Sequence, residues 1–122
     1  MVSTDLSQGA AIVDALERAN IKVSVALWVF LSEFEDWRML ISSRQFDMPD
    51  PRGAYRLLHD SLSGAGLALK KIPAIIIFPT SDPFVRALRR IFGKARSVEG
   101  MRLGGQMIGD RFVEDAYVYR IT

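Results

Sequence analysis

The sequence predicts one α+β domain that spans all 122 residues, in which a single mixed sheet of about five strands packs against three helices in the order α-β-β-α-β-α-β-β. Three observations carry this prediction. Residues 23–31 are apolar at every position but one, which is typical of a strand covered on both faces. Asp50-Pro51 and Asp82-Pro83 each place a capping carboxylate before a proline, which marks the start of a helix. The length and the absence of cysteine suit one hydrophobic core without disulfides.

The first half of the chain is expected to form a helix and a hairpin. Apolar side chains recur at helical spacing in residues 6–19, which predicts the first helix. After the strand at residues 23–31, the polar residues 32–36 suit a hairpin loop. Residues 37–41 are therefore expected to form a second strand antiparallel to the first, followed by a loop at residues 45–50.

The second half is expected to continue with helix, strand and helix. The helix after Asp50 should end within residues 63–66, where two glycines occur. Residues 74–78 are apolar throughout and too short for a helix, so they predict another buried strand. The helix that starts at Asp82 should end at Gly93. The connections that contain these helices are long enough for crossovers, so part of the sheet can be parallel.

The last segment is expected to be a hairpin. Residues 101–108 and 111–121 would be its strands, and Gly109-Asp110 is a typical two-residue turn. Residues 93–100 are expected to form a mobile connection before it.

The adjacent carboxylates Glu114 and Asp115 are the acidic pair of most interest. Strict alternation along the last strand predicts that they point to opposite faces, with Asp115 inward. An inward Asp115 needs a partner such as Arg38 or a helix N-terminus, because an unpaired buried charge is costly. This structural interpretation is favoured, and a catalytic site beside Tyr117 is the alternative.

A small enzyme would require Asp115, Tyr117, Arg38 and His59 to converge on one pocket. No metal or cofactor is predicted, because His59 is the only histidine and the chain has no cysteine. The phosphate loop, the dinucleotide loop and the Gly-x-Ser-x-Gly elbow are absent from the sequence. The enzyme class considered is a metal-dependent nuclease or hydrolase, but no Asp/Glu-x-Lys triplet supplies its ligands.

Charge is unevenly distributed along the chain. Residues 1–50 carry eight acidic and four basic side chains, and residues 51–122 carry six acidic and twelve basic ones. The basic excess is densest in a stretch made up of Arg86, Arg89, Arg90, Lys94, Arg96 and Arg102. Its first members have the spacing of one helix face, which predicts a site for phosphate, nucleic acid or another anion. The alternatives are a solvated helix face, or acidic and basic halves that fold against one another.

Four aromatic residues cluster around the predicted first hairpin: Trp28, Phe30, Phe34 and Trp37. Most of them are expected in the core. If one face of the sheet is uncovered, they form an interaction surface, and a homodimer is the simplest way to cover it. The favoured function is therefore a non-catalytic binding or interaction module that self-associates, ahead of the anion-binding and enzyme alternatives.

The sequence indicates a soluble, cytoplasmic protein without a membrane partner. Its first residues lack the basic and apolar regions of a signal peptide. The longest apolar run, residues 23–31, is shorter than the roughly 20 residues that a membrane helix needs.

Five stretches, considered together, are similar to one group of proteins. They are Ala26-Leu27-Trp28, Glu35-Asp36-Trp37-Arg38, Gly53-Ala54-Tyr55, Ser81-Asp82-Pro83 and Glu114-Asp115-Ala116-Tyr117-Val118-Tyr119-Arg120. With them the chain resembles, over nearly its whole length, a group of small uncharacterised bacterial proteins, and the last stretch is the most specific part. The resemblance implies a free-standing bacterial domain of about this length. It implies no activity, cofactor or partner.

Overall fold

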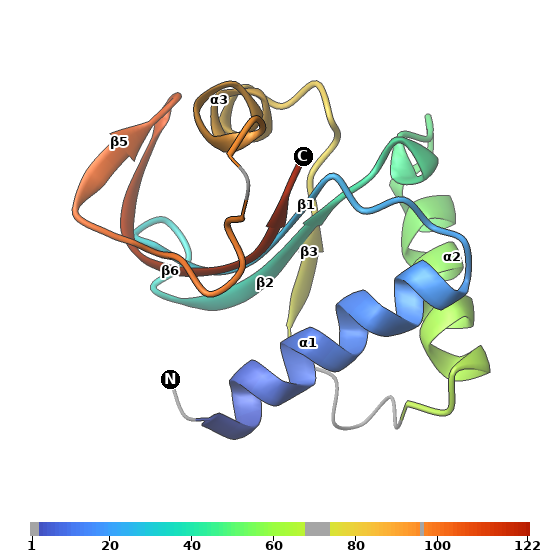
Figure 1. The fold of residues 1–122 in the computed structure, drawn as a ribbon. Helices are drawn as coiled ribbons and strands as arrows, with labels where there is room; N and C mark the ends of the chain where they lie inside the picture. The colour runs from blue at the N-terminus through green and yellow to red at the C-terminus, as the bar shows by residue number, and fades with distance from the viewer. Residues whose placement is uncertain (1–2, 68–73, 96) are drawn as a thin grey trace.

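The computed structural model describes residues 3–67, 74–95 and 97–122, and Figure 1 shows how the elements are arranged. The helices are α1 (Ser3–Arg18), α2 (Pro51–Gly64) and α3 (Pro83–Phe92), with a short 3-10 helix, η1 (Arg44–Phe46). The strands are β1 (Val25–Leu31), β2 (Asp36–Ser42), β3 (Ile75–Ile77), β4 (Arg102–Leu103), β5 (Gln106–Ile108) and β6 (Arg111–Ile121). The α+β class and the predicted order are confirmed, with one difference near the C-terminus.

The strands form a single mixed sheet in the order β3-β2-β1-β6-β4, and β5 pairs with the other end of β6. β1 is antiparallel to both of its neighbours, β2 and β6. β3 runs parallel to β2, because α2 lies in the connection between them and reverses the direction of the chain. The predicted first hairpin and the parallel part of the sheet are thus both present.

Both Asp-Pro signals start helices. The Asp50 carboxylate accepts a hydrogen bond from the Arg52 backbone N–H at 3.0 Å, and the Asp82 carboxylate accepts one from Phe84 at 2.8 Å. The two prolines occupy the first turn, where their missing N–H groups cost no helical hydrogen bond. α2 ends at Gly64 and α3 one residue before Gly93, as predicted.

The central strand β1 is buried on both faces, as its composition predicts. Its side chains alternate between two hydrophobic cores. Val25, Leu27, Val29 and Leu31 pack on the side of α3, and Ala26 and Trp28 pack on the side of α1 and α2. The sheet is therefore a middle layer, with α3 on one face and α1 and α2 on the other (Figure 1).

The predicted strand at residues 101–108 is wrong as a continuous element, because it is interrupted between β4 and β5. Gly105 has φ +64°, which an extended strand does not allow. A Cβ on Gly104 would lie 2.9 Å from the Glu114 carbonyl oxygen, so only glycine fits this close approach to β6. The two glycines make the corner that divides one predicted strand into two.

Strict alternation along β6 is also wrong, because the strand contains two β-bulges against β1. Phe30 pairs with Asp115 while the next residue of β1 pairs with Val113, so one residue of β6 is extra at this point. Val113 and Ala116 consequently share the core on the side of α3, and Glu114 and Asp115 both lie outside it. The two carboxylates do not divide between a buried and an exposed face.

β3 is half-buried and not fully buried as predicted, because it is the last strand on its side of the sheet. The predicted connection at residues 93–100 includes residue 96, which lies outside the described residues. None of the helices among the described residues is long and apolar enough to cross a membrane.

Candidate functional site

The four side chains predicted to form an enzyme site lie at separate places. Asp115 and Tyr117 are on β6, Arg38 is on β2 with β1 between them, and His59 is on the exposed side of α2. The predicted partner of Asp115 is wrong, because its carboxylate is 2.7 Å from the Arg102 guanidinium on β4. Asp115 is half-buried, so its ion pair with Arg102 is open to water. The carboxylate therefore needs no further charged partner to offset a cost of burial.

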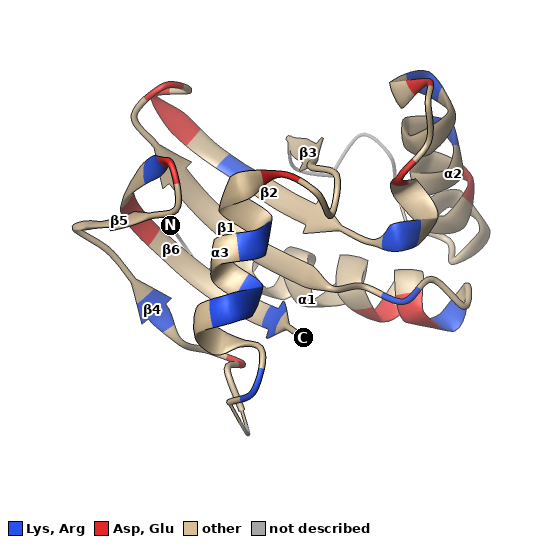
Figure 2. Ribbon diagram, turned by 90° about the horizontal axis from the view of Figure 1, so that it is seen from above, with Lys and Arg blue, Asp and Glu red and all other residues tan. Residues whose placement is uncertain are grey.

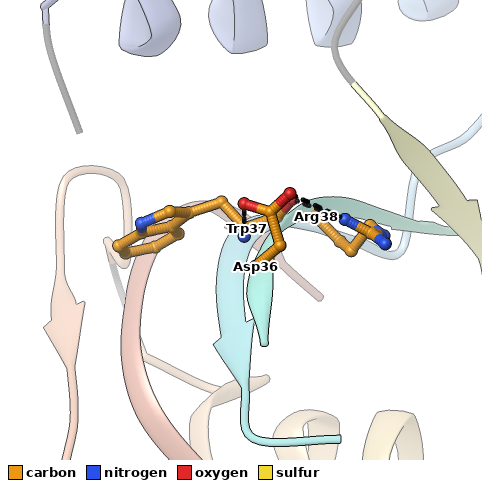
Figure 3. Close-up of polar contacts among 3 residues, drawn as sticks. All are labelled: Asp36, Trp37 and Arg38. Atoms are coloured by element: carbon orange, nitrogen blue, oxygen red, sulfur yellow. Dashed lines mark hydrogen bonds and ion pairs between the residues drawn. The ribbon is translucent and has the colours of Figure 1, made fainter. Parts of the chain in front are cut away.

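Arg38 is held within the β1–β2 hairpin (Figure 3). Its guanidinium lies 3.4 Å from the Asp36 carboxylate and 5.4 Å from the centre of the Phe34 ring. The same carboxylate accepts a hydrogen bond from the Trp37 backbone N–H at 2.7 Å. These contacts make Arg38 part of the hairpin's own structure.

Helix α1 is anchored to the sheet by two aromatic side chains that reach its backbone. The Trp28 indole N–H donates to the Asp5 carbonyl oxygen at 3.2 Å, and the Tyr119 hydroxyl donates to the Leu6 carbonyl oxygen at 2.6 Å. Trp28 is buried beneath the helix, in agreement with a core role. Burial raises the pKa of Tyr119 to about 12. A hydrogen bond with the Trp28 side chain lowers this pKa, and the nearby Tyr117 and Asp5 raise it.

The pKa of Tyr119 predicts a loss of stability in alkali. Unfolded tyrosine ionises near pH 10 and folded Tyr119 near pH 12, so alkali between these values favours the unfolded chain. We expect the contribution of Tyr119 to be constant below pH 10 and to fall from pH 10 to pH 12. Urea unfolding of the wild type and of Tyr119→Phe at a series of pH values measures it. If the difference between the two proteins is the same at every pH, Tyr119 does not titrate as described.

Part of the sheet face on the side of α1 carries exposed apolar side chains. Met107 on β5 and Phe112 on β6 are cross-strand neighbours, and they are 61% and 44% exposed. They alternate along their strands with Ile108 and Val113, which are buried in the core on the side of α3. Met107 and Phe112 therefore point away from α3.

Two more aromatic side chains lie on this face of the sheet. Phe30 and Trp37 are half-buried cross-strand neighbours in an edge-to-face arrangement, with ring centres 5.8 Å apart. Both lie on the same face of their strands as the residues that pack against α1. We call Phe30, Trp37, Met107 and Phe112 the apolar strip.

Phe30 and Trp37 were predicted from the sequence as aromatic residues of the first hairpin, whereas Met107 and Phe112 were not predicted. The signal for them is the turn: a two-residue loop at Gly109-Asp110 places Met107 opposite Phe112 on one face. Their exposure was not predictable, because it depends on how far α1 reaches across the sheet.

The basic stretch is only partly free to bind a partner. Arg89 donates to the Thr122 carbonyl oxygen at 2.7 Å, Arg102 pairs with Asp115, and Arg96 lies outside the described residues. The other three, Arg86, Arg90 and Lys94, are exposed at intervals of four residues along and just beyond α3, and no ion pair forms with them in the described ranges. We call these three residues the basic helix face.

The opposite charge collects at one end of the sheet. Figure 2 shows the basic residues of α3 in front of the sheet and acidic residues at the tips of the two hairpins. The exposed acids there are Glu33, Glu35, Asp36, Asp110 and Glu114. Arg111 joins the two hairpins, because it pairs with Glu33 and lies 3.9 Å from the Asp110 carboxylate. We call these five acids the acidic hairpin end.

An open hollow lies between the two hairpin tips. It is lined by Leu31, Ser32, Glu33, Asp110, Arg111 and Phe112. The hollow therefore combines two carboxylates with the edge of the apolar strip. Neither in this hollow nor elsewhere do the described residues contain a group of three histidine, aspartate or glutamate side chains that could hold a metal ion.

The fold and its surfaces define an α+β protein with a single mixed sheet and two exposed patches of opposite charge. Comparison of the chain with models of protein families, with curated proteins and with solved structures finds no match.

Proposed function

We propose that the protein is a cytoplasmic, non-catalytic interaction module that associates with copies of itself through the apolar strip. The observation that carries the proposal is the pair Met107 and Phe112, which are large, apolar, adjacent and exposed. Burying such surface in a contact is favourable by roughly 25 cal/mol per Å². A further copy of the chain is the simplest partner, because every molecule then carries the required surface.

The placement of the candidate catalytic residues supports a binding role. Asp115 is neutralised by Arg102, and Arg38 is tied to its own hairpin. His59 is on the exposed side of α2, whereas Ala54, Leu58 and Leu62 are the residues of this helix that are buried in the core. Each of these side chains has a local structural role or lies apart from the others.

Self-association is tested by light scattering after size exclusion, from micromolar concentrations upward. The wild type is expected to gain mass with concentration, and Met107→Ser/Phe112→Ser is expected to stay monomeric with an unchanged circular dichroism spectrum. Met48→Ser is the matched control, because Met48 is 39% exposed but lies outside the apolar strip. A wild type that stays monomeric throughout would contradict the proposal, and so would a loss of association in the control alone.

A second candidate, binding of phosphate or nucleic acid, is favoured by the basic helix face. Its three cations stand in one row without acidic partners in the described part of the chain, and about three phosphate contacts would give a salt slope of roughly −3 for duplex DNA. Titration of short duplex and single-stranded nucleic acid at several salt concentrations tests it. Arg86→Glu/Arg90→Glu should abolish binding, whereas Arg56→Glu on the exposed side of α2 should not. Equal binding by both variants would rule out this site.

A further inference from the structure

The basic helix face and the apolar strip point to opposite sides of the sheet. The acidic hairpin end lies between them, because Gly109 at the tip of one hairpin packs against the first turns of α3. α3 packs its buried side chains on one face of the sheet, so the basic helix face points outward from that side. Met107 and Phe112, beside the acidic hairpin end, point away from the opposite face. One neighbouring molecule therefore cannot cover α3 and the apolar strip of the same copy at once.

Each patch also carries exposed apolar surface. Four large hydrophobic side chains are exposed in the described ranges, and three of them lie in or beside the two patches. Ile91, which is 54% exposed, lies next to Arg90 on α3, and Met107 and Phe112 adjoin the acidic hairpin end. The patches thus match in apolar character and are opposite in charge.

A symmetric contact of either patch with its own copy brings like charges together. The acidic hairpin end has five acids against Arg38 and Arg111, and Glu35 and Glu114 form no ion pair within the described residues. Residues 83–94 carry four basic and no acidic side chains. Juxtaposed like charges strongly oppose association, whereas contact between the two different patches is favourable.

We propose that the protein associates head to tail, with the basic helix face of one copy docked on the acidic hairpin end of the next. This inference rests on the proposed self-association and specifies its geometry. Arg86 and Arg90 would engage Glu35 and Glu114, the two acids of that end that form no ion pair within the described residues, and Ile91 would contact the apolar strip. Because the contact is heterologous, it leaves one free patch at each end and adds further copies.

The wild type is therefore expected to form a series of species larger than a dimer as its concentration rises, and to lose them in high salt. Sedimentation velocity measures both effects. A wild type that remains monomeric would overturn the proposed function and this inference together. A wild type that stops at a dimer would overturn the head-to-tail geometry alone and leave self-association intact.

Two charge-reversal variants identify the patches. Arg86→Glu/Arg90→Glu makes both patches acidic, and Glu35→Lys/Glu114→Lys makes both patches basic. Each variant alone is expected to associate about a hundredfold more weakly than the wild type. An equimolar mixture should recover the large species, because each patch again meets one of opposite charge.

Two results would overturn this assignment of the patches. The first is a wild-type mass series in either variant alone, and the second is a mixture that stays monomeric. If Arg86→Glu/Arg90→Glu gives the first result and also no longer binds oligonucleotides, the basic helix face is assigned to nucleic acid instead. Unchanged circular dichroism and unfolding midpoints show that the variants are folded.

Discussion

Phe84→Ala is expected to lower the free energy of unfolding by about 3–5 kcal/mol. Phe84 is fully buried in the core on the side of α3, and its ring meets Phe78 edge-to-face at 6.4 Å. Removal of the ring leaves a cavity that α3 cannot close, because Val85 and Leu88 on the same helix are already packed. Urea denaturation monitored by circular dichroism measures the change.

Ile91→Ala is the matched control for Phe84→Ala. Ile91 lies on the same helix but is 54% exposed, so its truncation should change the free energy of unfolding by no more than about 0.5 kcal/mol. Equal losses in the two variants would show that α3 does not present Phe84 to the sheet and Ile91 to solvent.

Gly9→Ala is expected to destabilise the protein by about 1–3 kcal/mol, although alanine is ordinarily the better helix residue. A Cβ on Gly9 would lie 2.6 Å from the Tyr119 ring carbon that bears the hydroxyl. The ring cannot retreat without losing its hydrogen bond to the Leu6 carbonyl oxygen. The absence of a side chain at Gly9 therefore allows α1 to lie this close to β6. Thermal or urea unfolding of the wild type and of Gly9→Ala measures the loss of stability.

Two further variants separate this contact from helix propensity. Gly64→Ala, at the end of α2, meets no atom within 4 Å and should stabilise the protein by up to about 1 kcal/mol. In a Tyr119→Ala background, Gly9→Ala should lose most of its penalty. A penalty that persists without the tyrosine ring would show that the contact is not its cause.

Local chemistry in the chain was sufficient to predict most of the fold. The Asp50-Pro51 and Asp82-Pro83 pairs start helices because a carboxylate cap and a proline act within one turn. The uninterrupted apolar run of β1 requires cover on both faces, whatever supplies it. The α+β class and the order of elements follow from such short-range signals.

The candidate surfaces could be predicted only in part. Periodicity places Arg86 and Arg90 on an outer helix face, but it does not show that Arg89 reaches the carbonyl oxygen of Thr122. The exposure of Met107 and Phe112 depends on where α1 lies against a strand about a hundred residues away. Contacts between such distant segments leave no local pattern.

The bulges of β6 show why some features could be predicted from the sequence and others were decided only by the tertiary structure. Turns, caps and apolar periodicity act over a few neighbouring residues, so the order of elements and the Gly109-Asp110 turn could be read from the amino acids alone. The register of β6 against β1 is set by packing on two faces at once, and the extra residue near Asp115 satisfies both. Because this register depends on contacts between distant segments, it could not be predicted from the strand alone. With the bulge in place Asp115 pairs with Arg102, and the predicted strict alternation of Glu114 and Asp115 between the two faces is wrong.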